Sequence, residues 1–204
     1  MPDLRKKQRE KREHAIIEAT KKLIGEKGYR ETSIEEIAAA AEVGPATIYN
    51  YYGSKSGLML SIMEQEAESL LAAGEKVIGN PPAGAEDAVY SLIETYFEVF
   101  VRHFSKRLMR EVMVIFLIEQ LSIRKKMLGL DYVMMEQVAR ILNICRERGQ
   151  IRADLEIARA SLTIYSLVMS DAIAFVVDDD MALKTFFGLI KSQIYLLFQG
   201  FAPR

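Results

Sequence analysis

The stretch from residue 32 to residue 58 constrains the fold more than any other, because its helix start and stop signals define two short helices around a turn. It runs TSIEEIAAAAEVGPATIYNYYGSKSGL. Ser33 stands where an N-cap is expected, and Glu36, three residues later, completes a capping box. Apolar residues then recur at the helical spacing of three and four, at Ile34, Ile37, Ala38 and Ala41.

A second helix is predicted to begin at Pro45, because Gly44 precedes it as a cap and proline at the first helical position has its φ already set. Residues 53–54, Gly-Ser, end it. Ile48 and Tyr52 lie four residues apart and can face inward. The hydroxyl and amide side chains that remain point outward: Thr47, Tyr49, Asn50 and Tyr51. Two such helices form a helix-turn-helix, whose second helix can enter the major groove of DNA and contact phosphates and base edges.

Over residues 12–60 the chain closely resembles the DNA-binding domain of the TetR family of transcriptional regulators. The resemblance is carried by the Gly28-Tyr29 helix stop, the Thr32-Ser33 cap, the Ile37-Ala38 helix, Thr47-Ile48-Tyr49, Tyr51-Tyr52 and Ser54-Lys55. One position departs from the pattern, because the family usually has glycine in the turn where this chain has Glu42. If that position needs φ > 0, a residue other than glycine costs roughly 1 kcal/mol, which a packed domain can absorb.

The resemblance implies an all-α protein, with an N-terminal three-helix helix-turn-helix DNA-binding domain at residues 1–57. A C-terminal helical bundle at residues 58–204 would serve ligand binding and dimerisation. The DNA contacts follow from positions in the matching motif. Tyr49 and Lys55 are expected to hold phosphates, and Thr47 and Asn50 to contact base edges. The other expected contacts are Ser33 on a phosphate, Glu35 beside a base, Pro45 and Ala46 against a thymine methyl group, and Tyr51.

Charge is distributed unevenly along the 204 residues, although the formal net charge is only −1. Residues 1–57 hold 11 Lys/Arg against 9 Asp/Glu, whereas the remainder holds 16 against 19. A basic N-terminal end suits a protein that binds DNA at one end. The basic lead-in, residues 1–12, is either a frayed, solvated terminus or an arm that touches phosphates or the minor groove and orders on binding.

The rest of the chain is predicted to be helical. Residues 14–27 form the first helix, and a longer one runs from Lys55 to about residue 73. A loop follows at residues 74–84, where glycine and proline cluster. Further helices are expected at 85–103, 106–121, 124–148, 155–177 and 181–199, because no alternating, strand-like run occurs. The acidic run at residues 178–180 is predicted to cap the last helix.

The C-terminal region is rich in Phe and Met, which either fill a core between helices or line a pocket for a mainly apolar small molecule. Because TetR-like proteins usually carry an effector cavity among these helices, the resemblance favours a pocket. Its candidate lining residues are Phe97, Phe100, Phe104, Met109, Met113, Phe116, Met134, Met135, Asp171 and Phe175. Asp171 is costly to bury unpaired, so it either bonds across a subunit interface, faces solvent or meets a polar group of a ligand.

The two last predicted helices, 155–177 and 181–199, are apolar over more of their circumference than one core requires. A large exposed apolar patch normally marks an interface. In the TetR family the equivalent helices pair with their symmetry mates in a four-helix dimer interface. A homodimer through these two helices is therefore expected, and its two-fold symmetry would suit a near-palindromic operator.

No catalytic arrangement is present in the sequence: it has no glycine-rich phosphate loop, no nucleophile elbow and no paired carboxylates at a defined spacing. One cysteine and two histidines exclude an internal disulfide and a zinc-type cluster, so neither a metal nor a cofactor is expected. His103 is predicted to be a surface or core residue and Cys145 a buried, inert thiol. The charged N-terminus lacks a signal-peptide core and no stretch near twenty residues is free of charge, so a cytoplasmic protein that does not span a membrane is predicted.

The predicted function is that of a homodimeric transcriptional repressor, which binds double-stranded operator DNA and is released by a small hydrophobic effector. Three alternatives remain open. A DNA-binding regulator without small-molecule control would have a filled core. A regulator controlled by a protein partner would have an exposed patch outside the dimer helices. An all-helical enzyme or carrier would leave the proline-started second helix, with its outward Tyr and Asn, unexplained.

Overall fold

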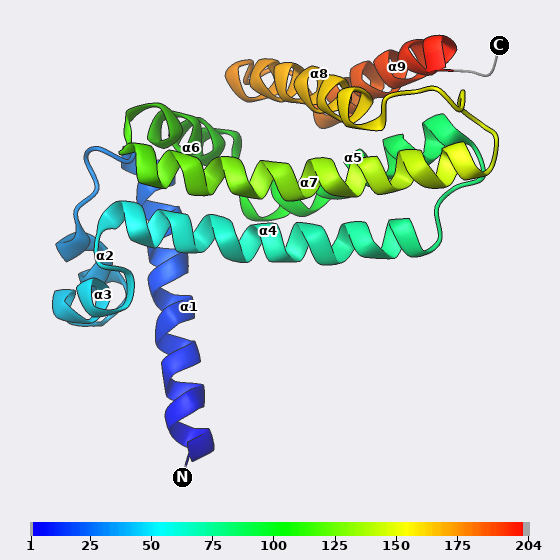
Figure 1. The fold of residues 1–204 in the computed structure, drawn as a ribbon. Helices are drawn as coiled ribbons and strands as arrows, with labels where there is room; N and C mark the ends of the chain where they lie inside the picture. Colours follow the sequence, from blue (N-terminus) through cyan, green and yellow to red (C-terminus); the bar gives the residue numbers. More distant parts are fainter. Residues whose placement is uncertain (1, 202–204) are drawn as a thin grey trace. The chain divides into compact units, whose positions relative to one another are not determined.

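The computed structural model describes the backbone of residues 2–201 and the side chains of residues 6–201, and every regular element in that part is an α-helix. In chain order the helices are α1 (Pro2–Lys27), α2 (Ile34–Ala40), α3 (Pro45–Tyr52), α4 (Lys55–Gly79), α5 (Ala85–His103), α6 (Lys106–Ile118), α7 (Leu121–Glu147), α8 (Ile157–Val177) and α9 (Leu183–Phe201) (Figure 1). The predicted all-α fold is confirmed, and α2 and α3 form the predicted helix-turn-helix.

The helices are divided between two compact units. The N-terminal unit comprises Met1–Gln65 and Arg107–Met127, and the C-terminal unit comprises Glu66–Lys106 and Leu128–Arg204. α4 and α7 therefore contribute to both units, and most of α6 belongs with α1, α2 and α3. The boundary expected between residues 57 and 58 is a functional division, which packing does not test, and it stays a prediction.

α1 is longer than the sequence pattern indicates. The start expected at residue 14 is wrong, because the helix already runs from Pro2. Proline is favoured in the first turn of a helix, and no glycine or proline interrupts the following 22 residues up to residue 24. The basic lead-in at residues 1–12 is thus helical where it is described; Met1 and the side chains before residue 6 lie outside the described residues.

The core of the N-terminal unit is built from apolar side chains of its first four helices. Ile16 and Ile24 of α1, Ile37 of α2, Ile48 of α3 and Leu58 of α4 are all fully buried. Burial of each such side chain contributes about 1.5–3 kcal/mol relative to leaving it in water. The same packing fixes which face of α3 is turned inward, and so leaves the opposite face to solvent.

The loop predicted at residues 74–84 is wrong in its first half, because α4 continues to Gly79. Gly74 lies inside the helix, where a Cβ would sit 2.2 Å from Gln137 Oε1 and 2.8 Å from Tyr96 Cε1. The missing side chain therefore allows α5 and α7 to approach α4 closely. The sequence pattern alone does not separate this role of glycine from that of a helix stop.

Gln137 of α7 connects α4, α5 and α7 through buried hydrogen bonds. Its Nε2 donates to Leu71 O at 3.0 Å and to Glu75 Oε1 at 2.7 Å. Its Oε1 accepts the hydroxyl hydrogen of Tyr96. Arg140 then donates to the Glu75 carboxylate from its two terminal guanidinium nitrogens, and these bonds lower the pKa of the Glu75 carboxyl. Because the buried amide is satisfied on both ends, the network fixes the second half of α4 in place.

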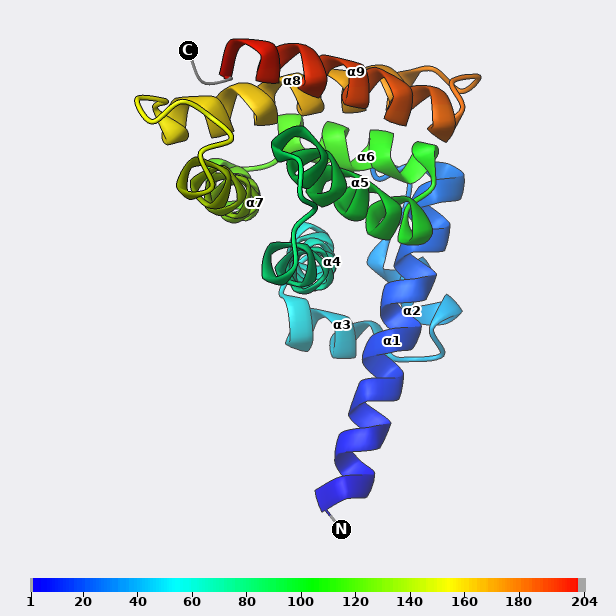
Figure 2. The same ribbon diagram turned by 90° about the vertical axis from the view of Figure 1, so that its right-hand side faces the viewer.

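The core of the C-terminal unit centres on α9, which packs against both α5 and α8 (Figure 2). Phe186 of α9 is fully buried. The ring of Phe97 lies 4.5 Å from it and that of Phe175 lies 4.8 Å from it, measured between centroids. Such aromatic pairs contribute about 0.5–1.5 kcal/mol beyond their buried area.

Fewer apolar side chains of α8 and α9 are exposed than the sequence suggests. Several of their large apolar side chains are buried within the chain, namely Phe175, Val176, Phe186, Ile190, Ile194 and Phe198. An exposed apolar set still remains, with exposed fractions from 40% to 67%: Leu162, Ile173, Val177, Leu189 and Leu196.

Within the described residues, α8 is long and apolar enough to cross a membrane, judged by length and composition alone. No stretch near twenty residues is free of charge, as the sequence analysis states, and the prediction that the chain does not span a membrane stays a prediction. α8 carries the charged residues Arg159 and Asp171, and 33% of its most apolar window is buried in the chain, where it packs against α9.

The acidic run at residues 178–180 closes the turn before α9 and does not cap the helix itself. Asp178 Oδ1 accepts hydrogen bonds from the backbone N–H groups of Asp180 at 2.9 Å and Met181 at 3.2 Å, while α9 begins at Leu183. Lys106 Nζ donates to the carbonyl oxygens of Asp178 and Met181, each at 2.6 Å. The predicted cap is thus wrong in position, because the carboxylate and the ammonium group together satisfy the backbone of the turn.

Replacing Gly74 by alanine is expected to lower the free energy of unfolding by about 1–3 kcal/mol, because the new Cβ must displace Gln137 or Tyr96. At an open helical position the same change stabilises by up to about 1 kcal/mol. Gly129→Ala in α7 is the matched control, since nothing lies within 4 Å of a Cβ there. Urea denaturation measures both variants, and equal stabilisation by the two would contradict a close approach at Gly74.

Candidate nucleic-acid interface

The N-terminus of α2 is closed by the predicted capping box. Glu36 N donates to Ser33 Oγ at 3.1 Å, and Ser33 N donates to Glu36 Oε2 at 3.0 Å. Lys27 Nζ also donates to the Glu36 carboxylate, and this bond lowers the pKa of Glu36. Ser33 is half-buried and its hydroxyl is engaged in the cap, whereas Glu35 is exposed.

The turn between α2 and α3 places Glu42 at φ 55°, in the left-handed region. The condition stated for this position, a positive φ, is therefore met, and the cost of a residue other than glycine applies. Val43 N donates to Ala38 O at 2.9 Å, which closes the end of α2. Gly44 then caps α3 with an extended backbone, and Pro45 occupies the first turn as predicted.

α3 turns one face into the core and the other to solvent. Ile48 is fully buried, whereas Tyr49 is 47% and Tyr51 38% exposed. The remaining predicted contact residues of this helix are exposed at Pro45, Ala46 and Asn50, and half-buried at Thr47. The helix carries no charged side chain, so its outer face offers hydroxyl and amide groups, which suit base edges and phosphates.

α1 reaches α3 through an arginine that the sequence analysis did not single out. Arg9 Cζ lies 5.5 Å from the centroid of the Tyr51 ring, a cation–π distance. The Arg9 guanidinium also donates from Nε to Glu13 Oε1 at 2.8 Å. The Arg9–Glu13 pair follows from the spacing of four residues, but its position over Tyr51 depends on how α1 and α3 pack.

Lys55, at the start of α4, binds backbone carbonyls of the preceding segment. Its Nζ donates to Tyr29 O at 2.5 Å and to Thr32 O at 2.7 Å, and it lies 4.3 Å from the centroid of the Tyr29 ring. Partial burial lowers the pKa of the Lys55 ammonium group. A phosphate contact by Lys55 stays a prediction. It requires the ammonium group to donate to a phosphate as well as to these carbonyl oxygens, or in place of them.

Tyr29 connects the helix-turn-helix to α6, a contact with no signal in the sequence pattern. Its backbone N–H donates to Glu111 Oε2 and its hydroxyl to Glu119 Oε1, both at 2.7 Å. Arg107 donates to Glu26 O at the end of α1. α6 thereby satisfies free backbone groups where α1 ends, and it holds the segment that leads into α2.

Two hollows lie within the N-terminal unit. The first is an open groove of about 520 Å³ beside α3, and Arg9, Glu13 and Tyr51 are among its lining residues. The second is an apolar cavity of only about 10 Å³ between α4, α6 and α7, lined in part by Met59 and Met127. The cavity has room for about one water molecule. None of the ten residues predicted to line an effector pocket borders either hollow.

The residues predicted to line an effector pocket are distributed over both units. Met109, Met113 and Phe116 lie on α6 in the N-terminal unit. In the C-terminal unit Met134 and Met135 lie half-buried on α7. Aromatic members of the set pack together, with Phe97 and Phe175 on Phe186 and Phe100 stacked on Phe104 at 4.7 Å. A pocket lined by this set stays a prediction.

Asp171 has a partner that the sequence analysis did not consider. Gln193 Nε2 of α9 donates to Asp171 Oδ1 at 3.2 Å. Among the described residues, Asp171 Oδ2 is buried and has no hydrogen-bond partner. The observed contact is thus within the chain, and a role at a subunit interface or toward a ligand stays a prediction for Oδ2.

His103 and Cys145 both take structural positions. His103 Nδ1 lies 2.6 Å from Glu66 Oε2, so it pairs α5 with α4. Cys145 is 1% exposed, and burial raises the pKa of its thiol. Because the thiolate is the reactive form, burial disfavours reaction at Cys145.

Replacing Glu42 by glycine is expected to raise the free energy of unfolding by about 1 kcal/mol, because glycine has no Cβ to disfavour φ 55°. Glu42→Ala removes the same charge and keeps the Cβ, so it should give no such gain. Thermal unfolding followed by circular dichroism compares the two variants. A gain that is equal for alanine and glycine would assign the effect to charge and not to backbone conformation.

Comparison with known proteins places this interface in a family. Residues 16–62, which contain α2 and α3, match the model described as bacterial regulatory proteins, tetR family. The fatty acid metabolism regulator protein of Bacillus subtilis is 24% identical over 180 residues, covering 85% of this chain and 88% of that protein. The regulator EthR of Mycolicibacterium smegmatis is 27% identical over 92 residues, so the match spans 45% of this chain and only 42% of EthR.

The fold is shared with solved structures of regulators. The crystal structure of FadR from Bacillus subtilis in complex with stearoyl-CoA superposes with a TM-score of 0.79 at 22% identity, covering 92% of this chain and 98% of that one. The sequence match falls on the capped helix-turn-helix, whose outer face carries the tyrosines and Asn50. Residues 16–62 thus belong to the TetR family of DNA-binding domains, which is a family of transcriptional regulators and not of enzymes, and the whole chain shares the fold of such a regulator.

Proposed function

We propose that this regulator is a homodimeric repressor, which binds a near-palindromic operator and is released by a mainly apolar small molecule. The observation that carries the proposal is the exposed, uncharged outer face of α3, held by the buried Ile48 within a helix-turn-helix of the TetR type. A surface of hydroxyl and amide groups on a firmly packed short helix is suited to the major groove. The regulator would act in the cytoplasm, where it can reach its operator.

The contact residues fall into three roles in this proposal. Thr47 and Asn50 read base edges, and Pro45 and Ala46 pack against thymine methyl groups. Phosphates are held by Tyr49, Tyr51 and Lys55, and by Ser33 at the N-terminus of α2, where the helix dipole favours an anion. Glu35, exposed in the first turn of α2, lies where it can accept a hydrogen bond from a cytosine amino group.

The exposed apolar side chains of α8 and α9 support the homodimer. Leu162, Ile173 and Val177 of α8 are 48–66% exposed, and Leu189 and Leu196 of α9 are 40% and 67% exposed. Their burial against a second copy would remove apolar surface from water, the main driving force of association. A two-fold dimer of this kind presents two copies of α3, so the operator needs two half-sites related by inversion.

A long-chain acyl thioester is the effector class that we propose. The relatives support it, because one is a fatty acid metabolism regulator and another was solved with stearoyl-CoA. The Phe and Met side chains of the C-terminal unit are adaptable enough to open around an acyl chain. Release of DNA then requires that the effector bind the released form more tightly than the DNA-bound form. α4 and α7, which belong to both units, are the covalent connection for that response.

A regulator without small-molecule control is the second candidate, and one observation favours it. Phe97, Phe175 and Phe186 pack against one another at centroid distances of 4.5 and 4.8 Å, as the side chains of a filled core do. A sensor of a protein partner is also compatible with that packing. Binding of acyl thioesters separates these alternatives from the main proposal.

The purified protein is expected to select an inverted repeat from a random pool of DNA duplexes. Asn50→Ala should weaken binding to the recovered sequence by about 1–3 kcal/mol and relax preference at one base pair of each half-site. Lys184→Ala on α9 is the control, since it removes an exposed side chain far along the sequence from α3. Recovery of no sequence, both before and after unfolding and refolding to strip bound ligands, would refute the DNA-binding role.

Stearoyl-CoA is expected to weaken retention of the recovered operator in an electrophoretic assay, and coenzyme A alone is not. The acyl chain is expected to bind the released form more tightly than the DNA-bound form, because burial of each CH₂ in the released form contributes about 0.8 kcal/mol. Shortening the chain from eighteen to eight carbons, as a matched series, should weaken the response. Unchanged operator affinity across the whole series would remove acyl thioesters as effectors and leave the DNA-binding role intact.

A further inference from the structure

We propose that the first three turns of α1 form a second DNA contact, in which Lys6 and Arg12 bind phosphates beside the segment held by α3. The proposal rests on the DNA-binding function proposed above and adds a separate site to it. Its ligand is the sugar–phosphate backbone of duplex DNA, and it is therefore independent of base sequence.

The part of α1 that precedes the core is long enough to reach past α3. Ile16 is the first fully buried residue of the helix, so residues 2–13 stand in front of the packed part. At 1.5 Å per residue these residues span about 18 Å, which is comparable with the width of a DNA duplex. Figures 1 and 2 show this segment extending beyond α2 and α3 of the same unit.

The positive charges of this segment repel one another along the helix, and a bound anion would reduce that repulsion. Residues 6–12, KKQREKR, hold five basic side chains against one acidic one, and all seven side chains are exposed. Like charges that lie three or four residues apart on a helix, such as Lys7 and Lys11, each destabilise it by about 0.2–0.5 kcal/mol. The pair of Lys6 and Glu10, 4.0 Å apart, offsets little of this. A polyanion would relieve this mutual repulsion.

Arg9 holds this segment beside α3. Its guanidinium lies over the ring of Tyr51 and binds Glu13, and all three residues line the open groove next to α3. Arg9 is therefore a positioning residue, with its charge already paired within the protein. DNA that docks on the outer face of α3 passes the same groove, so its flanking phosphates come within reach of the neighbouring cations of α1.

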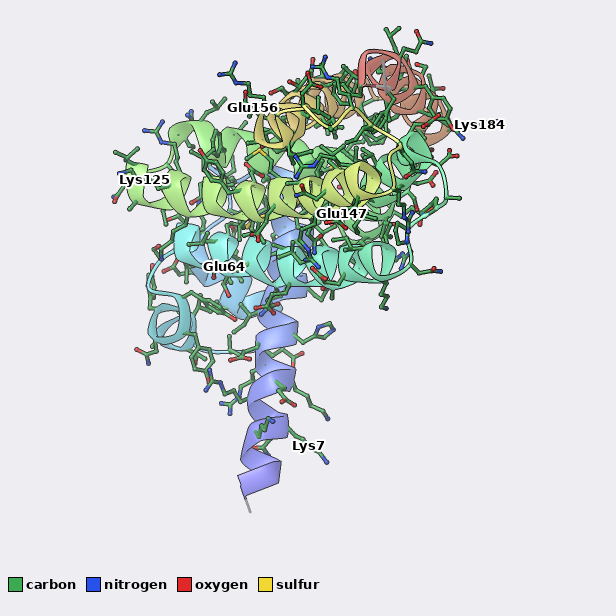
Figure 3. All side chains as sticks on the ribbon, turned by 45° about the vertical axis from the view of Figure 1, so that its right-hand side comes forward. Lys7, Glu64, Lys125, Glu147, Glu156 and Lys184 are labelled. Atoms are coloured by element: carbon green, nitrogen blue, oxygen red, sulfur yellow. The ribbon has the colours of Figure 1, made fainter. Side chains whose placement is uncertain are left out.

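The cations of this segment divide between two sides of the helix. Lys6, Arg9 and Arg12 follow one another at a spacing of three, and Ile16 continues the row four residues later, so this side faces α3 and the core. Lys7 and Lys11 lie on the opposite side. Figure 3 shows Lys7 pointing away from α3. The helix thus contains its own control, because two cations besides the paired Arg9 face the proposed DNA path, and two face away from it.

The test compares two double variants that remove the same charge, Lys6→Gln with Arg12→Gln, and Lys7→Gln with Lys11→Gln. Arg9 is left in place, since its loss would also disturb Tyr51. Affinity is measured from 50 to 200 mM salt, on the operator recovered by selection and on a 30-base-pair duplex of random sequence. The first variant should reduce the slope of log affinity against log salt by about 2 for each DNA-binding domain of the dimer. The loss of affinity between 50 and 200 mM salt then becomes about tenfold smaller for each domain.

The second variant should change the slope by less than half as much, on both duplexes. Hydrogen exchange gives an independent measure, because backbone amides of residues 6–12 should exchange more slowly in the DNA complex of the wild type. Equal slope changes in the two variants, or none in either, would overturn the contact while leaving DNA binding by α3 intact. If the wild type binds neither duplex, the DNA-binding function itself fails. Thermal unfolding of both variants within a few degrees of the wild type confirms that the helix-turn-helix is folded.

Discussion

The N-terminal unit depends on the contacts of Tyr29, which lies where α1 ends. Its backbone N–H and its hydroxyl bind the carboxylates of Glu111 and Glu119 on α6, and its carbonyl accepts a hydrogen bond from Lys55 on α4. Because Tyr29 is only 5% exposed, each of these polar groups needs its partner, and burial together with the Glu119 bond raises the pKa of its hydroxyl. Three segments that are distant in sequence are thereby fixed at one point.

These contacts hold the helix-turn-helix in position within the N-terminal unit. α2 and α3 are too short to be stable alone, and they gain their positions from α1, from the first turns of α4 and from α6. Any influence that changes the place of α6 relative to α1 must break or remake bonds to charged groups, which contribute about 1.5–3 kcal/mol each. That magnitude is in the range of measured coupling energies between sites in allosteric proteins.

The predictions from sequence were most accurate where the signals are local. The capping box at Ser33 and the start of α3 at Pro45 each follow from a few neighbouring residues. Glycine was less informative, because Gly74 looks like a helix stop in the sequence and is a point of close packing in the structure. The excess of apolar residues in α8 and α9 was likewise overestimated, because most of them pack within the chain.

The sequence by itself determined the all-α fold, the helix-turn-helix and the side chains that α3 offers to DNA, because helical periodicity and capping act over three or four residues. Only the tertiary structure decided that the Lys55 ammonium group binds carbonyls, that Arg9 stacks on Tyr51, and that Tyr29 is held by α6. The carboxylates that bind Tyr29 come from residues 82 and 90 positions further along the chain. Such partners are set by how whole helices pack, and no local spacing rule encodes them.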